Sequence, residues 1–353
     1  GLNRYDGHHL ENYRFLQSEP NSLSSNLVTK ITEDHAGTLW ISTIGGGLNY
    51  YNSVTNDFRA FLSDPNNRDS PYSNNILSIF TDNTGMIWLG YINGFSSFNP
   101  ESKRFRHYIS GSENIPYLGE VLDFAQTDDG AVWVATQSSG LIRIAPRSLE
   151  ISVHDQVFPS IVSERAAAIT KIITSEDGAL WIASRESGIC HFDPTNEAIQ
   201  LFRHDEEKIT SIASNRTYDI HEDREGRIWI ATFEGLNLYD EQTETFIKFN
   251  NNELPNKQTF SIFQSREGKY WIGTVFGLVT GTESHFPKFD RLNGQLSNNS
   301  VNAFQETSDG SLWVGTDDGL NRLRPGMNEF EWINEYTVPS ISNSTVMSLL
   351  GEG

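Results

Sequence analysis

Histidine is the residue type in this chain best suited to acid–base or metal chemistry, and nine histidines are present. They share no recurring position: His8, His9, His35, His107, His154, His191, His204, His221 and His285. None of them pairs with another ligand at a spacing typical of a metal site. Cys190 adjoins His191, but neighbours on a strand point to opposite faces, so we do not expect them to act together. The sequence predicts no catalytic constellation, no metal site and no cofactor.

Ten other residues lie at or just beyond the end of a tryptophan-bearing segment that recurs along the chain. They are Tyr91, Asn93, Gln137, Arg185, Glu186, Phe233, Glu234, Phe276, Asp317 and Asp318. Aromatic faces, amides, carboxylates and one guanidinium can together bind an oligosaccharide or another polar molecule. We therefore take these ten as candidate ligand-binding residues. The alternative interpretation is a solvated rim with no small-molecule site, and docking of a partner through the rim is included in that alternative.

The recurring segment explains how these residues would be positioned. Gly37-Thr38-Leu39-Trp40-Ile41-Ser42-Thr43 is followed by six further copies, each with the tryptophan three residues after the glycine. Successive tryptophans are 48, 45, 48, 48, 42 and 42 residues apart, and only Trp332 lies outside the pattern. A strand-rich repeat of this length is typical of a β-propeller.

Each repeat reads as four strands. The first carries two apolar residues three apart, such as Val28 and Ile31, which we attribute to an inner strand enclosed on both faces. A turn follows that begins with a short polar residue such as Asp34, whose side chain can accept a hydrogen bond from the backbone. The tryptophan strand, a Gly-Leu strand and an aromatic strand complete the repeat. The residue two after each tryptophan is Ser, Ala or Gly, which lets a neighbouring sheet approach.

This pattern predicts an all-β fold, a β-propeller of four-stranded antiparallel blades, with seven blades favoured. The alternative is eight blades, one of them incomplete and closed by the two termini. We expect residues 1–353 to form a single propeller domain. Within it, residues 1–15 resemble the back half of a repeat and residues 340–353 the start of a further one. We expect no helix longer than a turn.

Net charge and cysteine content limit which partners the chain can bind and which covalent links it can form. The formal net charge of −20 argues against nucleic acid and an anionic membrane surface, because both require clustered Lys and Arg. The single cysteine, Cys190, excludes an internal disulfide, and we expect a packed, inert thiol. No apolar run is long enough to cross a membrane, so no membrane contact by this chain is expected.

The combined pattern resembles the two-component regulator propeller repeat, most clearly at residues 217–249 and 301–323. In that family the repeats build the extracytoplasmic sensor region of hybrid histidine kinases or diguanylate cyclases. The resemblance implies a periplasmic, non-catalytic domain that senses a ligand or a partner. The partner would be a neighbouring propeller or a second subunit of the same protein. A propeller enzyme resembling streptogramin lyase and a protein-interaction scaffold remain alternatives.

Overall fold

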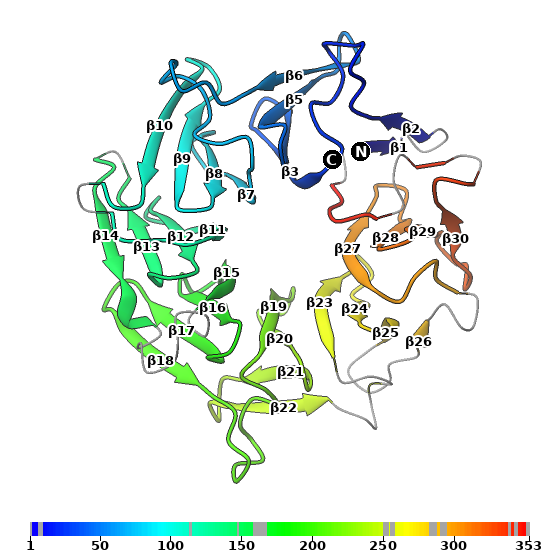
Figure 1. Ribbon diagram of the computed structural model, residues 1–353. Helices are drawn as coiled ribbons and strands as arrows, with labels where there is room; N and C mark the ends of the chain where they lie inside the picture. Colours follow the sequence, from blue (N-terminus) through cyan, green and yellow to red (C-terminus); the bar gives the residue numbers. More distant parts are fainter. Residues whose placement is uncertain are drawn as a thin grey trace. The chain divides into compact units, whose positions relative to one another are not determined.

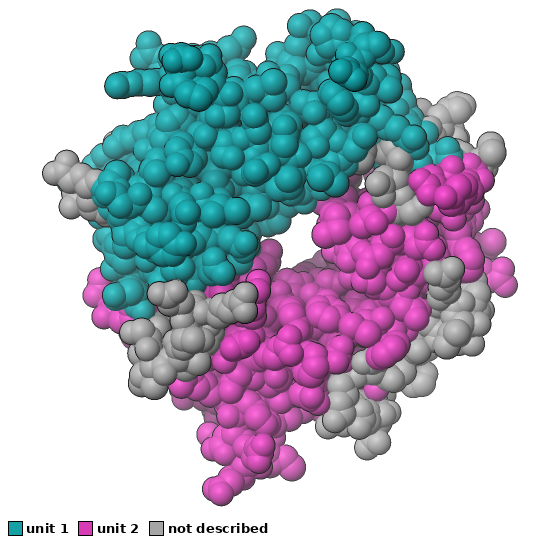
Figure 2. Space-filling view, in the orientation of Figure 1, with its two compact units in different colours: residues 1–155, 339–343 teal, residues 156–338, 344–353 magenta. Residues whose placement is uncertain are grey.

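The structure is a computed structural model of the chain. It describes residues 2–5, 10–112, 115–146, 148–157, 168–249, 254, 258–281, 288–289, 295–337, 340–341 and 345–350. The chain divides into two compact units, which Figure 2 colours separately. Unit 1 comprises residues 1–155 and 339–343, and unit 2 comprises residues 156–338 and 344–353.

Unit 1 contains a two-stranded hairpin and three four-stranded antiparallel blades. The hairpin consists of β1 (Leu2–Tyr5) and β2 (Leu10–Tyr13). Blade 1 consists of β3 (Val28–Glu33), β4 (Leu39–Thr43), β5 (Leu48–Asn52) and β6 (Asp57–Phe61). Blade 2 consists of β7 (Ser78–Thr81), β8 (Ile87–Tyr91), β9 (Gly94–Asn99) and β10 (Arg104–Ile109). Blade 3 consists of β11 (Val121–Gln126), β12 (Val132–Thr136), β13 (Leu141–Ile144) and β14 (Ile151–His154).

Unit 2 contains four more blades of the same kind. Blade 4 consists of β15 (Ile169–Thr174), β16 (Leu180–Ser184), β17 (Ile189–Asp193) and β18 (Ala198–Phe202). Blade 5 consists of β19 (Thr217–Glu222), β20 (Ile228–Thr232), β21 (Gly235–Asp240) and β22 (Thr245–Phe249). Blade 6 consists of β23 (Thr259–Gln264), β24 (Tyr270–Thr274), β25 (Gly277–Gly281) and β26 (Lys288–Phe289). Blade 7 consists of β27 (Val301–Glu306), β28 (Leu312–Thr316), β29 (Gly319–Leu323) and β30 (Glu331–Ile333).

The predicted fold class is confirmed: the chain has the all-β fold of a seven-bladed propeller with four-stranded antiparallel blades. In each blade the four strands pair in chain order, and within unit 2 the first strands β15, β19, β23 and β27 are successive neighbours (Figure 1). The one helical element in the described part of the chain is a 3-10 turn at Asp155–Val157. No helix among those residues is long and apolar enough to cross a membrane.

A β-bulge explains the apolar spacing of the first strands. In blade 1 the register against β4 shifts between Val28 and Lys30, so Thr29 is an extra residue. The same shift recurs in blades 3 to 7. At a bulge, two residues of one strand lie opposite a single residue of the partner strand. The alternation of side chains is shifted there by one residue, so apolar residues three apart point to the same face. Our attribution of that spacing to burial on both faces was therefore incomplete.

In blades 1, 2 and 5 the turn before the tryptophan strand is fixed by its first residue, as predicted, and by a contact that we did not predict. In blades 3, 4 and 7 the backbone donates instead to the aspartate two residues later, which is Asp129, Asp177 or Asp309. In blade 1 the carboxylate of Asp34 accepts hydrogen bonds from the backbone N–H groups of Ala36 and Thr38, both at 2.9 Å. It also accepts one at 2.8 Å from the indole Nε1 of Trp40. Equivalent indole bonds reach Asp82, Thr127, Asp223 and Thr307. The bond from the ring fixes the spacing between the polar residue and the tryptophan.

Within each unit, a blade packs against the next through its tryptophan strand. Trp88, which is 2% exposed, lies in a cluster with Val121 and Val134 of blade 3. The small residue two positions later gives the next blade room, as predicted. A Cβ added at Gly90 would lie 2.9 Å from Cγ1 of Val121, and one at Gly315 would lie 2.6 Å from Cγ1 of Val346. Those distances are too short for a carbon–carbon contact, so glycine is required there.

The two end segments pack as parts of blades. Leu2 and Tyr13 of the hairpin pack against Tyr51 and Phe58 of blade 1. The backbone N–H of Val346 donates a 2.8 Å hydrogen bond to the carbonyl of Thr316, as Ile76 does to Thr43 at the start of blade 2. Residues 345–350 therefore lie against blade 7 in the place that a first strand occupies elsewhere.

Candidate functional site

One edge of the blades brings the predicted ligand-binding residues to the surface. The residue after the tryptophan strand donates its backbone N–H to the carbonyl of the residue before the first strand of the same blade. The pairs are Ile44–Leu27 (2.8 Å), Gln137–Glu120 (2.8 Å), Arg185–Ala168 (2.9 Å), Phe233–Arg216 (3.0 Å), Val275–Gln258 (3.3 Å) and Asp317–Ser300 (3.2 Å). In these blades the loop entering the blade and the turn between strands two and three therefore share an edge. We call this edge the rim.

In unit 1 the rim joins blades 2 and 3 through two predicted residues. The backbone N–H of Asn93 donates to the carbonyl of Gly119 at 2.7 Å. The side-chain Oε1 of Gln137 accepts from the backbone N–H of Glu120 at 3.1 Å. The Oδ1 atom of Asn93 is buried and has no hydrogen-bond partner among the described residues. The structure thus brings Asn93 and Gln137 together, chiefly to hold the Gly119–Glu120 segment.

Tyr91 is not on the rim surface, contrary to its expected position at the mouth. Its side chain is 0% exposed and lies in a cluster with Leu48 and Phe98 between blades 1 and 2. Its ring centroid lies 5.9 Å from that of Tyr72. The tyrosine replaces the threonine that bonds the local backbone elsewhere, as Thr43 does with Gly47. Because the larger ring turns into the interface between the blades, it is not accessible to a ligand in this structure.

The other predicted residues lie on the rim of unit 2. Arg185 and Glu186 are exposed in blade 4, and Phe276 of blade 6 is 51% exposed. Phe233 and Glu234 of blade 5 and Asp318 of blade 7 are half-buried, while Asp317 is exposed. The carboxylate of Asp317 accepts a 2.9 Å hydrogen bond from the side-chain amide of Asn302.

Sequence reasoning missed a cation that contacts one of these residues. The guanidinium carbon of Arg216 lies 4.5 Å from the centroid of the Phe233 ring, a cation–π contact. Arg216 is exposed and immediately precedes β19. Arg185 was named as the one basic residue at the mouth because only the turn after the tryptophan was considered. The sequence did contain a signal for Arg216, because the residue before the first strand of a blade lies on the same rim as the turn after the tryptophan strand.

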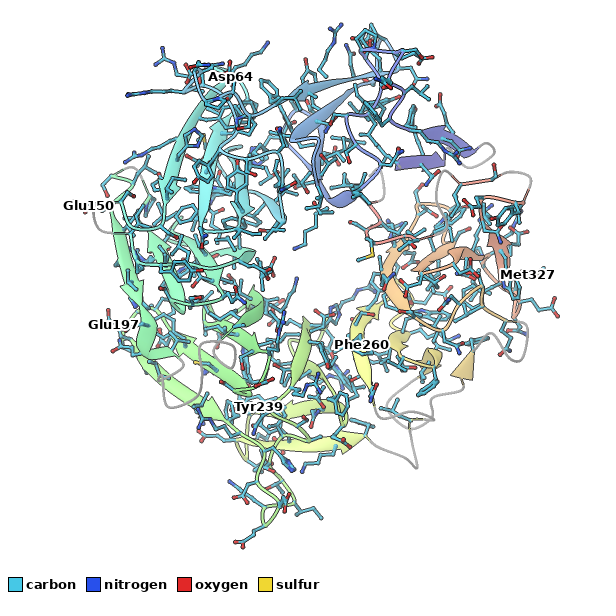
Figure 3. The ribbon with its side chains drawn as sticks, viewed as in Figure 1. Asp64, Glu150, Glu197, Tyr239, Phe260 and Met327 are labelled. Carbon is cyan, nitrogen blue, oxygen red and sulfur yellow. The ribbon has the colours of Figure 1, made fainter. Side chains whose placement is uncertain are left out.

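Two more aromatic rings form a second contact near the start of the first strands of blades 5 and 6. Tyr218 follows Arg216 by two residues on β19, and its ring centroid lies 4.6 Å from that of Phe260 on β23. Figure 3 labels Phe260, on the inner strand of its blade. We call Arg216, Tyr218, Phe233 and Phe260 the rim cluster. It offers aromatic faces and a guanidinium, with carboxylates and amides on neighbouring rim positions, and such groups bind polar ring-shaped molecules.

The residues considered for catalysis lie elsewhere. Cys190 is 0% exposed, and burial raises the pKa of its thiol to about 12, so it is protonated at neutral pH. His191 lies beside it on β17, and its ring centroid is 4.6 Å from that of Trp181. Burial lowers the pKa of His191. Among the residues that the structure describes, no group of three or more His, Cys, Asp and Glu could hold a metal ion.

Comparison of the sequence with protein families identifies the repeat. The model of the two-component regulator propeller matches residues 22–45, 211–234 and 295–318. The matched segments fall in blades 1, 5 and 7, and each includes the tryptophan strand. None of the curated proteins compared with the chain is detectably similar to it in sequence.

Solved structures share the fold at low sequence identity. One is the extracellular domain of BT3049 from B. thetaiotaomicron, assigned to the hybrid two-component systems, with a TM-score of 0.60 and 19% identity. The match covers 95% of this chain and 50% of that structure, so the chain spans half its length. A streptogramin B lyase has a TM-score of 0.60 at 14% identity, covering 92% of this chain and 97% of that one. The Dos1 propeller has a TM-score of 0.65 at 12% identity, and the match covers 92% of this chain and 87% of that one.

Proposed function

Because the chain carries two-component regulator propeller repeats, we propose that it is the sensing domain of a membrane-bound signalling protein. In this proposal the domain lies in the periplasm, has no catalytic activity of its own, and passes ligand or partner binding to a histidine kinase or diguanylate cyclase. The resemblance to an extracellular domain assigned to a hybrid two-component system supports this setting. The streptogramin lyase shares the fold to the same extent, so the proposal depends on the site and not on the fold.

The rim cluster carries the proposal. Arg216 lies over Phe233 on the rim of blade 5, and Tyr218 lies beside Phe260 near the start of the first strands of blades 5 and 6. Aromatic faces pack against the apolar faces of sugar rings, while guanidinium and carboxylate groups bind hydroxyls. An oligosaccharide or another polar ring-bearing molecule is therefore the ligand class that we propose for the rim of unit 2.

Removing the cluster should abolish ligand binding. We expect the Arg216→Ala/Phe233→Ala double variant to lose the rise in melting temperature that a bound oligosaccharide gives the wild-type chain. The physical reason is that the stabilisation by a ligand depends on its affinity for the folded state. The measurement is a thermal-shift screen of polysaccharide fragments, followed by calorimetric titration of each fragment that stabilises the wild-type chain.

Arg266→Ala is the matched control, because Arg266 is exposed in the turn before β24 and away from the rim. It should leave the ligand-induced shift unchanged. A shift that survives in the double variant would contradict the site. Chemical turnover of a ligand by the purified chain would contradict the sensor proposal and favour the lyase-like alternative.

A protein partner is the second candidate, and exposed apolar side chains on the rim of unit 1 favour it. Leu27 is 61% exposed, Ile92 53% and Tyr117 61%. Each lies at a rim position of its blade: Leu27 accepts from Ile44, Ile92 pairs with Glu120, and the carbonyl of Tyr117 accepts from Ser139. Burying such side chains against a partner removes apolar surface from water, which favours association. We propose that a second subunit or a neighbouring propeller of the same protein docks here.

Charging this surface should weaken self-association. We expect Leu27→Asp/Ile92→Asp to raise the dimer dissociation constant about tenfold or more, because each aspartate must lose its water on docking. Sedimentation over a range of concentrations measures this constant. Val54→Asp is the control, since Val54 is 92% exposed in the turn between β5 and β6. An equal effect of the control, or a wild-type chain that stays monomeric, would contradict a docking surface for a second subunit.

A further inference from the structure

Blades 3, 4 and 7 share a contact that joins the third strand to the turn before the tryptophan strand. In these blades the turn begins with Thr or Ser, and an aspartate follows two residues later: Asp129, Asp177 or Asp309. The third-strand residue opposite the tryptophan is Arg143 in blade 3 and Arg322 in blade 7. In blade 4 it is His191, opposite Trp181. This position is therefore permanently cationic in two of the blades and titratable in the other.

One oxygen of the aspartate holds the turn in the same way in these blades. Oδ1 accepts a hydrogen bond at 2.6 Å from the hydroxyl of the first turn residue in each case. It also accepts from the backbone N–H two residues after the aspartate, at 3.0, 3.1 and 2.9 Å in blades 3, 4 and 7. Because these bonds fix the carboxylate, its other oxygen, Oδ2, is held toward the third strand.

In the two arginine blades this second oxygen is paired. Arg143 Nη2 donates to Oδ2 of Asp129 at 2.6 Å, and Arg322 Nη2 donates to Oδ2 of Asp309 at 2.9 Å. Each guanidinium carbon also lies over the tryptophan ring of its own blade, at 5.9 Å in blade 3 and 5.1 Å in blade 7. We call the pairs Arg143–Asp129, Arg322–Asp309 and His191–Asp177 the clasps.

The clasp of blade 4 has the same groups at a longer distance. Nε2 of His191 lies 4.0 Å from Oδ2 of Asp177, which is beyond hydrogen-bond length. The imidazole covers the indole as the guanidinium groups do, with its ring centroid 4.6 Å from that of Trp181. A neutral imidazole has one N–H donor, whereas the protonated ring has two and carries a positive charge. Protonation therefore gives His191 the donor and the charge that the arginines have.

The surroundings of His191 determine when it takes up a proton. Burial lowers the pKa of the ring, so the ring is neutral at neutral pH and is protonated only below the ordinary histidine value of about 6.5. The charged groups that face it act in the opposite direction and are all acidic: Asp177, Asp193 on β17 itself and Glu241 between β21 and β22 of blade 5. Gln200 lies opposite on β18 and donates to Glu244.

We propose that the clasp of blade 4 is a pH-sensitive switch, open while His191 is neutral and closed when it is protonated. Closing it forms a charge-assisted hydrogen bond between His191 and Asp177. That bond ties β17 to the turn before β16, as the arginine clasps do at every pH in blades 3 and 7. The proposal does not depend on ligand binding at the rim, because neither residue belongs to the rim cluster.

The switch extends to the contact between blades 4 and 5. Glu222, at the end of β19, accepts a 3.0 Å hydrogen bond from the backbone N–H of Glu176 in blade 4. Burial raises the pKa of Glu222, and so do the charges of three neighbouring acids, Glu176, Asp177 and Asp223. A proton on His191 offsets the charge of Asp177, so closing the clasp relieves part of the repulsion where the two blades meet.

A double-mutant cycle at two pH values tests the switch. The variants are His191→Gln, Asp177→Asn and the two combined, and urea unfolding measures how far their effects depart from additivity. The effects should be additive at about pH 8 and non-additive at about pH 5, where the folded wild-type chain has the closed clasp. NMR titration gives a second readout. The pKa of His191 should fall in the Asp177→Asn variant, because a carboxylate that favours the charged ring is removed.

The Arg143–Asp129 clasp is the matched control. Its side chains are 29% and 53% exposed, against 25% and 63% for His191 and Asp177. The cycle of Arg143→Gln and Asp129→Asn should be non-additive to the same degree at both pH values, because a guanidinium keeps its charge. His191→Arg should make the clasp of blade 4 behave in the same way. Three results would each overturn the proposal: additive effects at both pH values in blade 4, an equal departure from additivity at both, or an unchanged pKa of His191 in Asp177→Asn.

Discussion

Replacing Trp88 by alanine should lower the free energy of unfolding by about 3–5 kcal/mol. The indole is 2% exposed and packs between blades 2 and 3, beside Phe95 and Val134. Its Nε1 donates to the carboxylate of Asp82 at 2.7 Å. The variant would leave a large cavity between blades and a buried acceptor without its donor. Urea unfolding followed by far-UV circular dichroism measures the change.

Trp332→Ala is the matched control, because it deletes the same side chain from the one tryptophan outside the repeat. Trp332 is 38% exposed on β30, and its Nε1 donates to the carbonyl of Gln295 at 3.2 Å. We expect a loss of about 1 kcal/mol or less. Similar losses in the two variants would contradict the claim that the repeated tryptophan forms the packed centre of each blade.

Asp223→Ala should be destabilising by a similar amount, about 3–5 kcal/mol. Oδ2 of this buried carboxylate accepts from the Tyr270 hydroxyl at 2.6 Å, Trp229 Nε1 at 2.7 Å and Arg227 Nε at 2.8 Å. Tyr270 comes from the neighbouring blade 6, so one carboxylate joins two blades. The alanine variant removes an acceptor from the Tyr270 hydroxyl, the Trp229 indole and the partly buried guanidinium of Arg227.

The same network should make stability depend on pH. Burial alone would raise the pKa of Asp223, but the hydrogen bonds from Tyr270 and Trp229 and the charge of Arg227 hold it below its ordinary value. A lowered carboxyl pKa stabilises the folded state at neutral pH, and that stabilisation is lost as the pH falls through the folded-state value. The wild-type chain should therefore lose stability on acidification more steeply than the Asp223→Ala variant, as urea unfolding at several pH values would show.

The Asp34→Ala variant distinguishes the stability contributed by the turn from the stability contributed by the contact between blades. Asp34 fills the same place in blade 1 and binds the backbone and Trp40. Among the described residues, its oxygens accept from no group of another blade. We expect it to cost about 1–3 kcal/mol, less than Asp223→Ala. Equal costs would show that the bonds from Tyr270 and Arg227 add nothing to stability.

The fold could be predicted because it depends on residues repeated in phase. The Gly-x-x-Trp spacing, the small residue after the tryptophan and the polar residue before the turn each follow from contacts within a blade or with the next one. Seven copies made these signals strong. The bulge in the first strands was missed because an extra residue produces the same spacing as burial on both faces.

The candidate site was harder to predict because it depends on contacts between segments distant in sequence. Phe233 was found from its place after the tryptophan strand, but Arg216 lies before the first strand and meets it only after the blade forms. Tyr91 was misplaced because a tyrosine in the position of a threonine can point outward or inward, and packing with Leu48 and Phe98 decided the direction. Whether the remaining candidates bind one ligand stays a prediction.

The close approach of Val121 to Gly90, and of Val346 to Gly315, has a consequence for how such arrays evolve. The tryptophan strand of one blade is fitted to the first strand of the next, so these two strands have to change together. A duplication that copies a whole blade separates them, whereas one that starts inside a blade and ends inside the next keeps them together. The unit that preserves the fit between neighbouring blades is therefore offset from the four-stranded blade.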